Sequence, residues 1–295
     1  MEWLQANLSP TAVSIISFLS AFGEELFMVL VIGFLYWCYD KEAGKRVGLS
    51  VLMVNVWNPM IKNVAIRRRP YFDHKGIRIL RVVDPSADAM DISAQGYSFP
   101  SGHSGNASSL FGGIAAALKK KWLVCLAVVI PLLVGFSRVA MGAHYPTDVL
   151  CGWAVGLIAV FLVPWLGKVI PNKYAFYGVL LLTALPGFFF CRSTDFYTGF
   201  GLLAGFLAGT LAEERFVRFE TTRSPLRAIL RVVAGGALFF ALNSLLKLPF
   251  SKDFLNSGTQ AALLVRCARY AVVSFCGFGL YPLFFRWTAK FWKKA

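Results

Sequence analysis

The sequence predicts an all-α membrane protein, a polytopic bundle of about nine transmembrane helices. Hydrophobic residues make up 57% of the 295 residues, charged residues make up 15%, and the mean hydropathy is +0.61. Soluble domains rarely have this composition. Apolar runs of membrane-spanning length recur from end to end, as lipid-embedded helices require, and no separate soluble domain is left over.

Charged connectors divide the chain into nine candidate spans. They cover residues 23–39, 47–66, 104–118, 122–139, 147–167, 174–190, 197–212, 228–246 and 270–286. Several are shorter than the roughly 20 residues that a perpendicular span prefers. Residues 2–19 are apolar but are interrupted by Asn7, Ser9 and Pro10, which favours an interfacial or re-entrant helix over a tenth span.

The net charge of +15 indicates membrane topology rather than nucleic-acid binding, because the Lys and Arg residues lie in short connectors between apolar runs. Basic connectors at residues 41–46, 119–121, 168–173, 215–227 and 286–294 all fall on one side, which we predict to be cytoplasmic. The opposite side holds segment 67–103 and the turn 140–146. Segment 67–103 is also rich in Arg, which indicates binding of phosphate or anionic headgroups there.

Three segments on that opposite side carry residues suited to phosphate chemistry. They are KNVAIRRRP with Lys62 and Arg69, PSGH with Ser101, Gly102 and His103, and SRVAMGAHYPTD with Ser137, Arg138, His144 and Asp148. An ammonium and a guanidinium suit phosphate oxygens. The N–H groups of Ser101 and Gly102, at a helix start, can receive negative charge. The spacing of Lys62 and Arg69 spans about two helical turns, so both can reach one anion.

The histidines indicate the reaction. Asp148 lies four residues after His144. A carboxylate there can hold one imidazole nitrogen and leave the other free to attack, so we predict that His144 is the nucleophile.

Four charged residues near the motifs receive structural or interfacial interpretations. Arg67 and Arg68 are expected to contact lipid headgroups rather than to take part in catalysis. Glu24 and Glu25, at the opening of the first span, are expected to pair with Arg residues.

The three segments together resemble the signature of the type 2 phosphatidic acid phosphatase superfamily. The pattern K-x6-R-P, P-S-G-H, S-R-x5-H-x3-D is matched at every position. The resemblance implies a helical core shared with the haloperoxidases and a phosphohistidine intermediate on His144. It implies that His103 is the general acid and that Asp148 completes the catalytic set. The phosphate would be bound by Lys62, Arg69, Ser101, Gly102 and Arg138, with no metal and no cofactor.

The resemblance also suggests how the chain is organised. Residues 1–170 form the predicted phosphatase core, with an N-terminal interfacial helix, and residues 171–295 form additional transmembrane helices of unknown role. Segment 71–99 is a candidate cap that helps to select the substrate. The span count and the opening of the first span look closest to the sphingosine-1-phosphate phosphatase and glucose-6-phosphatase branches.

The predicted function is hydrolysis of a lipid phosphate or diphosphate at the non-cytoplasmic face of the membrane. The alternatives are a soluble sugar-phosphate phosphatase, a lipid-linked phosphotransferase, and a transporter or receptor with a vestigial site. The expected partners are a phosphorylated lipid or small phosphorylated substrate and membrane lipids, without nucleic acid; the oligomeric state is left open. We expect a bacterial inner membrane with the site facing the periplasm or exterior, with a lumenal site in the endoplasmic reticulum as the alternative.

Overall fold

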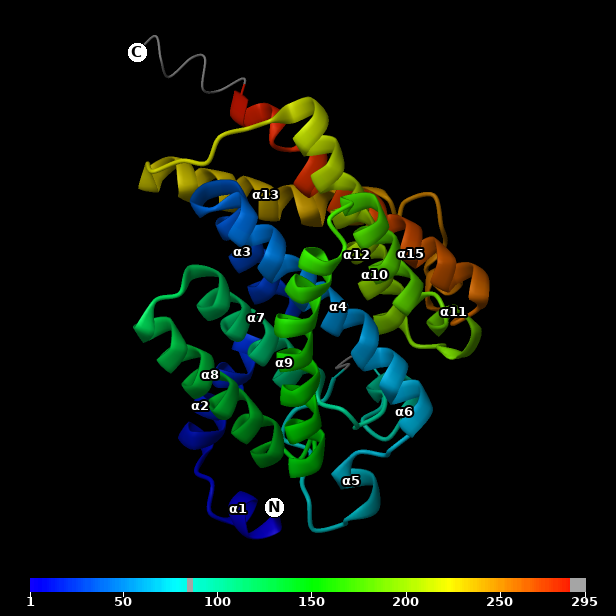
Figure 1. Ribbon diagram of the computed structural model, residues 1–295. Coiled ribbons are helices and arrows are strands. Elements are labelled where there is room, and N and C mark those ends of the chain that lie inside the picture. The colour runs from blue at the N-terminus through cyan, green and yellow to red at the C-terminus, as the bar shows by residue number, and fades with distance from the viewer. Residues whose placement is uncertain (84–86, 287–295) are drawn as a thin grey trace.

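The computed structural model describes residues 1–83 and 87–286, and every regular element in these ranges is helical. Figure 1 shows the helices in one bundle, with the N-terminus at the lower end. The first half contains α1 (Glu2–Ala6), α2 (Pro10–Ser20), α3 (Glu25–Phe34), α4 (Lys41–Ala65), α5 (Pro70–Asp73), α6 (Ile92–Gln95), α7 (Gly102–Leu118), α8 (Lys121–Ala140) and α9 (Pro146–Val169). The second half contains α10 (Lys173–Ala184), α11 (Gly187–Phe190), α12 (Thr194–Ala212), α13 (Pro225–Leu245), α14 (Lys252–Asn256) and α15 (Gln260–Phe275).

Three long helices continue into short π-helical turns. These are η2 (Leu35–Tyr39) after α3, η3 (Glu213–Val217) after α12 and η4 (Cys276–Leu280) after α15. A short 3-10 turn, η1 (Ala21–Gly23), joins α2 to α3.

Helix α4 lies between the two halves of the bundle. It packs against α7 and α9 on one side and against α12 on the other, while α12 packs most extensively against α15. Close approach of α7 and α9 depends on glycine: a Cβ at Gly152 would overlap the carbonyl oxygen of Ser101. Small residues allow this approach in membrane helices. As a result, the start of α7 and the start of α9 lie side by side.

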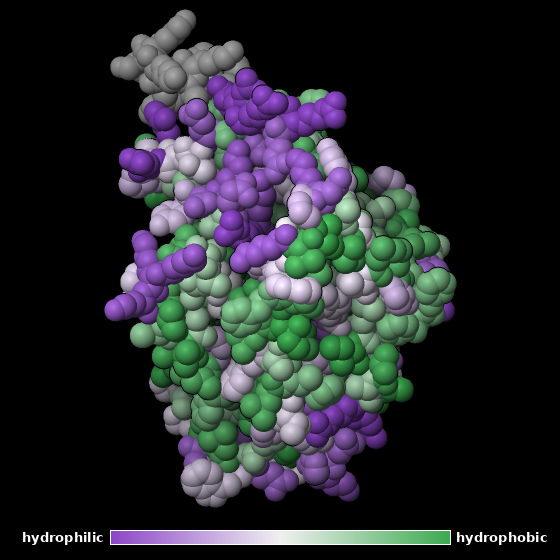
Figure 2. Space-filling view, in the orientation of Figure 1, coloured by the Kyte–Doolittle hydropathy of each residue, from purple (hydrophilic) through white to green (hydrophobic). Residues whose placement is uncertain are grey.

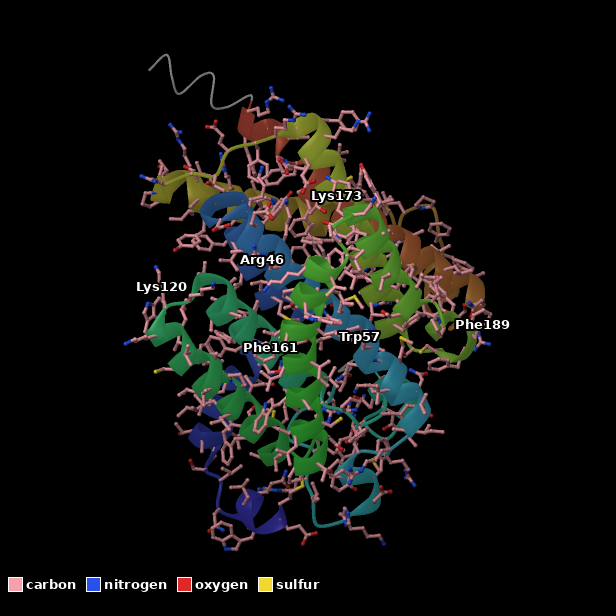
Figure 3. The ribbon with its side chains drawn as sticks, viewed as in Figure 1. Arg46, Trp57, Lys120, Phe161, Lys173 and Phe189 are labelled. Atoms are coloured by element: carbon pink, nitrogen blue, oxygen red, sulfur yellow. The ribbon has the colours of Figure 1, made fainter. Side chains whose placement is uncertain are left out.

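The apolar surface forms a belt between two hydrophilic ends. Figure 2 shows this belt in the middle of the molecule, with polar residues gathered above and below it. Phe161 on α9 and Phe189 on α11 point outward from it (Figure 3) and are 68% and 86% exposed. Exposed aromatic and aliphatic side chains in such numbers are expected only where lipid covers them.

The predicted number of nine spans was wrong. Among the described residues, five helices are long and apolar enough to cross a membrane, and a sixth span is possible if the bent pair at 10–39 forms one span. The five cover Lys121–Ala140, Pro146–Val169, Lys173–Phe190, Pro225–Leu245 and Gln260–Arg286. The predicted segments 47–66, 104–118 and 197–212 form α4, α7 and α12, which other helices largely bury. Because protein rather than lipid covers these three, they tolerate polar residues that a lipid-facing span does not.

The N-terminal prediction was close to what the structure shows. Residues 2–19 form α1 and most of α2, and α2 with η1 meets α3 at a bend of 50°. This geometry suits either a broken span or a re-entrant loop.

Candidate active site

The structure brings the predicted site residues together at one end of the core. Lys62 lies in the last turn of α4, Ser101 to His103 open α7, and Arg138 is in the last turn of α8. His144 lies in the turn after α8, and Asp148 is in the first turn of α9. Helix ends therefore carry the site, and the long bodies of these helices fix its position.

His144 is oriented by a carboxylate on one side and a cation on the other. Its Nδ1 lies 3.5 Å from Oδ2 of Asp148, and its Nε2 lies 3.4 Å from Nη1 of Arg69. The side chain is 2% exposed, and Nδ1 has no hydrogen-bond partner among the described residues. At 3.5 Å the carboxylate acts as a close charge that favours a proton on Nδ1. Nε2 is then the nitrogen that carries the lone pair, and Arg69 Nη1 donates to it.

The surroundings of His144 keep its imidazole neutral. Burial, followed by the positive charges of Arg69, Lys62 and Arg138, lowers the pKa of His144 well below its ordinary value. Loss of water and nearby cations both disfavour the protonated ring. A neutral imidazole is the nucleophilic form, so His144 is in the protonation state that the predicted nucleophile requires.

Asp148 is fully buried and has several donors. Its Oδ2 accepts hydrogen bonds from the backbone N of Tyr145, at 2.8 Å, and from the hydroxyl of Ser98. Its Oδ1 forms an ion pair with Nη1 of Arg67 at 2.9 Å. Arg67 also lies 3.9 Å above the ring of Tyr145. These contacts hold the carboxylate in one position beside His144.

Arg67 and Ser98 are residues that sequence reasoning missed. The prediction that Arg67 contacts headgroups was wrong, because its guanidinium turns inward to Asp148. Ser98 lies three residues before Ser101, and its spacing carried no signal of a role. Arg68 instead lies 3.4 Å from Asp73, half-exposed. Glu24 forms an ion pair with Arg81, so the expectation of a structural pair was confirmed for Glu24.

Arg69 reaches the site by a route that the spacing did not predict. Helix α4 ends at Ala65, and Ile66 adopts a left-handed conformation with φ of 46°. The two-turn argument was therefore wrong: Arg69 lies outside the helix, and the chain reversal returns it to Lys62. Its Nε donates to the carbonyl oxygens of Gln95 and Gly96, both at 3.0 Å.

Three cations surround the site without a carboxylate of their own. Arg69 Nη1 donates to the carbonyl oxygen of Ala143 at 3.1 Å, and Lys62 Nζ donates to that of Tyr97 at 2.8 Å. Arg138 Nη1 donates to the hydroxyl of Ser20 at 2.8 Å. Within the described ranges, none of the three forms an ion pair within 4 Å. Their unneutralised charge makes the pocket attractive to a polyanion.

The start of α7 adds backbone donors. Ser101 is the N-cap residue, and its hydroxyl accepts hydrogen bonds from Ser104 N at 3.4 Å and Ser104 Oγ at 2.9 Å. Its own N–H donates to the carbonyl oxygen of Asp148 at 2.9 Å, so this group is not open to a ligand. Helical geometry leaves the N–H groups of Gly102 and His103 without an acceptor inside the helix. These two donors, rather than that of Ser101, are placed to receive an anion.

A cavity of about 570 Å³ leads to the site. His103 and Arg138 form its polar floor, and Glu24 and Arg81 lie across it as an ion pair. The remaining wall is aliphatic and is formed by Ile79, Leu80, Val82 and Val83. Residues 79–83 thus contribute a wall of the cavity, whereas a cap at segment 71–99 that selects the substrate stays a prediction.

These features define the class of protein. A helical membrane bundle encloses a buried cationic pocket, and a neutral histidine oriented by a carboxylate faces that pocket. This is the arrangement of an integral membrane enzyme that transfers or hydrolyses phosphoryl groups.

The comparisons with known proteins agree with this class. The profile of the PAP2 superfamily matches residues 43–170, and that of the PAP2 superfamily phosphatase transmembrane extension matches residues 197–291. Phosphatidylglycerophosphatase B of Bacillus subtilis is 34% identical over 161 residues, covering 50% of this chain and 70% of that protein. Undecaprenyl-diphosphatase of Sulfolobus acidocaldarius is 28% identical over 158 residues, covering 53% of this chain and 71% of that protein. No solved structure matched significantly.

The chain belongs to the PAP2 superfamily and is an integral membrane phosphatase of lipid phosphates or diphosphates. The expected likeness to the sphingosine-1-phosphate phosphatase and glucose-6-phosphatase branches was wrong, since these relatives are bacterial and archaeal lipid phosphatases. The additional helices, which suggested those branches, match an extension of PAP2 phosphatases instead.

Proposed function

We propose that the protein removes a terminal phosphate from a lipid phosphate or diphosphate through a phosphohistidine on His144. The observation that carries this proposal is the group of three cations, Lys62, Arg69 and Arg138, which contact only neutral partners beside Nε2 of His144. A phosphate there would have its oxygens neutralised while its phosphorus faces the imidazole lone pair.

The first half-reaction transfers the phosphoryl group to the enzyme. Nε2 of His144 forms a bond to phosphorus, and the bond from phosphorus to the leaving oxygen breaks. Burial and the neighbouring cations lower the pKa of His103, so the proton that it donates is held there only when the negative phosphate is bound. His103 then donates this proton to the leaving oxygen, and the dephosphorylated lipid leaves as a neutral hydroxyl or as a shorter phosphate. Arg69 and Lys62 stabilise the charge that develops on the phosphoryl oxygens, and Asp148 stabilises the positive imidazole.

The second half-reaction restores the enzyme. His103, now neutral, takes a proton from water, and the resulting hydroxide attacks phosphorus. The phosphorus–nitrogen bond breaks, its electron pair returns to Nε2 of His144, and inorganic phosphate leaves. Every step uses side chains of this chain.

The cavity supports a lipid substrate. Its aliphatic wall at residues 79–83 offers apolar contact to an alkyl or prenyl chain, while His103 and Arg138 face the phosphate. The printed names of the relatives, phosphatidylglycerophosphatase and undecaprenyl-diphosphatase, suggest the two substrates to test. We propose the same two classes here, a phosphatidyl monophosphate and a prenyl diphosphate.

The location of the site is part of the proposal. Figure 3 shows Arg46, Lys120 and Lys173 toward the upper part of the bundle, away from the site at the lower end. By the positive-inside rule, the basic end faces the cytoplasm and the site faces the opposite side. In a bacterium this is the periplasmic or outer side of the inner membrane.

Phosphate release by purified protein tests the proposal. Phosphatidylglycerophosphate, undecaprenyl diphosphate and glucose 6-phosphate should be compared in the same detergent. Lipid substrates should be hydrolysed with a kcat/KM at least about tenfold above that of glucose 6-phosphate, because only they can use the apolar wall. Faster hydrolysis of the sugar phosphate would contradict the lipid assignment. Acid-labile labelling of the enzyme by a radioactive substrate phosphate, absent in His144→Ala, tests the intermediate.

A further inference from the structure

A second cluster of polar side chains lies away from the cavity, where α3 meets the C-terminal helices α12, α13 and α15. These four helices meet in the upper half of Figure 1. Arg266 and Arg269 on α15 form the centre of the cluster. Arg266 Nε donates to the hydroxyl of Thr198 on α12 at 2.8 Å, and Arg269 Nη2 donates to Oδ1 of Asn243 on α13 at 2.7 Å.

The positive charges of the two arginines are not paired with a carboxylate among the described residues. Arg269 is 6% exposed, and its Nε is buried without a hydrogen-bond partner among the described residues. Within residues 1–83 and 87–286, neither guanidinium forms an ion pair within 4 Å. The carboxylates of Glu25 and Asp195 act on the cluster only at longer range. Both guanidiniums lie near the ring of Tyr270, at 5.7 and 6.0 Å, so they point to one region.

A narrow apolar pocket of about 40 Å³, enough for only part of an acyl chain, lies about one helical turn along the same helices from this cluster. Its lining includes Val29 of α3, Leu202 of α12, Phe239 of α13 and Val273 of α15. Each of these residues is four positions, about one helical turn, from a member of the cluster on the same helix. The corresponding pairs are Glu25 with Val29, Thr198 with Leu202, Asn243 with Phe239, and Arg269 with Val273. A polar layer therefore covers an apolar pocket on all four helices.

We infer that this layered cleft binds an anionic phospholipid, with the phosphate at Arg266 and Arg269 and an acyl chain in the apolar pocket. Guanidinium groups suit phosphate oxygens, and a phosphodiester would supply the acceptor that Arg269 Nε lacks. Apolar contact below the headgroup excludes a purely soluble anion as the preferred occupant. The apolar pocket shares no lining residue with the catalytic cavity, although Glu25 of the cluster directly follows Glu24 of the cavity in the chain.

Two kinds of variant test the two layers. Arg266→Gln and Arg269→Gln remove the charge while keeping hydrogen-bonding capacity. Gly277→Leu instead adds an aliphatic side chain at the edge of the apolar pocket: Gly277 lines it, and a Cβ there would meet nothing within 4 Å, so the added side chain has room to obstruct the pocket. Gly277→Leu leaves both arginines and their partners intact, so it remains informative if an arginine variant fails to fold.

Matched controls are available in the same chain. Arg286→Gln removes an arginine that donates to the carbonyl oxygen of Val217, outside the cluster and outside the lining of the pocket. Gly178→Leu adds the same side chain on α10, where a Cβ would also meet nothing within 4 Å. Neither residue lines the apolar pocket.

Native mass spectrometry of the purified protein in phosphatidylglycerol nanodiscs measures the bound lipid. Phosphatidylglycerol is a phosphodiester, so it survives a phosphomonoesterase. We expect each test variant to retain about tenfold less phosphatidylglycerol than the wild type. The arginine variants lose a charge-assisted bond, and Gly277→Leu loses apolar contact with the acyl chain. Both controls should retain the wild-type amount. Phosphatidylcholine should be retained weakly by all forms.

Three results would overturn the inference. The first is wild-type retention by Arg266→Gln and Arg269→Gln in folded protein, which would leave the arginines a structural role alone. The second is wild-type retention by Gly277→Leu, which would show that no acyl chain occupies the apolar pocket. The third is full displacement of the lipid by millimolar inorganic phosphate, which would make the site one for free phosphate.

Discussion

The two ends of the core both bury a carboxylate, but the surrounding charges differ. At the catalytic end, Asp148 is fully buried, and three further cations, Lys62, Arg69 and Arg138, contact only neutral groups. At the opposite end, Glu213 is also fully buried and is paired with Lys41 at 2.8 Å.

The opposite end is electrically balanced. Glu214 accepts from both Lys45 and Lys173, and Glu213 accepts from Tyr36 and from the backbone N of Phe219 as well as from Lys41. These contacts join α4 and η2 to η3 of the C-terminal half. Burial of charge is thus common to both ends, whereas of these two ends only the catalytic one carries buried cations without an ion pair among the described residues. Surplus charge rather than burial marks the functional end, because a structural pair must neutralise itself and a binding site must not.

The largest expected effect is at the nucleophile. His144→Ala should lower kcat at least roughly a thousandfold, because it removes the imidazole on which the proposed covalent intermediate forms. Phosphate release from the lipid substrate measures this loss, and retained vanadate binding shows that the pocket is intact. A variant with a rate near the wild type would move the chemistry to another residue.

Removal of one surplus cation should have the next largest effect. Arg69→Gln should lower kcat/KM about a hundredfold, since the guanidinium stabilises transition-state charge in a site with little water. Arg68→Gln is the matched control, because Arg68 is half-exposed and pairs with Asp73. Equal losses in the two variants would show that general attraction of the anion, rather than the surplus charge at the site, governs the rate.

The pH dependence of enzyme phosphorylation tests whether the unpaired cations of the catalytic end keep His144 neutral. Burial and the neighbouring cations lower the pKa of His144 well below 6.5. The neutral nucleophile therefore persists as the pH falls through 6.5 and is lost only below the lowered pKa, where single-turnover phosphorylation should fall roughly tenfold per pH unit. In Arg69→Gln the acid limb should move to higher pH. If the rate of phosphorylation instead falls at the ordinary histidine pKa, burial and the neighbouring cations do not lower the pKa of His144.

The contact between Arg67 and Asp148 predicts a smaller effect. Arg67→Gln should lower kcat about tenfold by loosening the carboxylate beside His144, with little change in KM. Arg67→Lys should restore part of the rate, because an ammonium keeps the charge but not the forked geometry. A rise in KM alone would instead place Arg67 at the substrate headgroup.

The smallest effect on the reaction is expected at the balanced end. Glu213→Gln should keep kcat within about twofold of the wild type, while the free energy of unfolding falls by about 2 kcal/mol through loss of the buried partner of Lys41. Thermal unfolding in detergent measures the stability. A large loss of kcat with unchanged stability would show that this end also serves catalysis.

Short sequence motifs predicted which residues lie together in the candidate site. The residue types and spacing of the three motifs predicted an anion site, and the pair His144 and Asp148 predicted an oriented imidazole. These inferences need only short-range information, because a residue four positions from another on a turn and helix start is constrained to lie nearby. Which end faces the cytoplasm stays a prediction from the basic connectors.

Other features depended on contacts between distant segments. The role of Arg67 and Ser98 depends on the approach of segment 67–98 to the start of α9, and the position of Arg69 depends on the reversal at Ile66. The span count failed because none of α4, α7 and α12 is both long enough and apolar enough to qualify as a span, and their exact bounds were known only from the structure. The composition of the sequence determines that this protein lies in a lipid bilayer, and the spacing of its motifs predicts its chemistry. Packing between helices decides which charges are neutralised and which remain for the substrate.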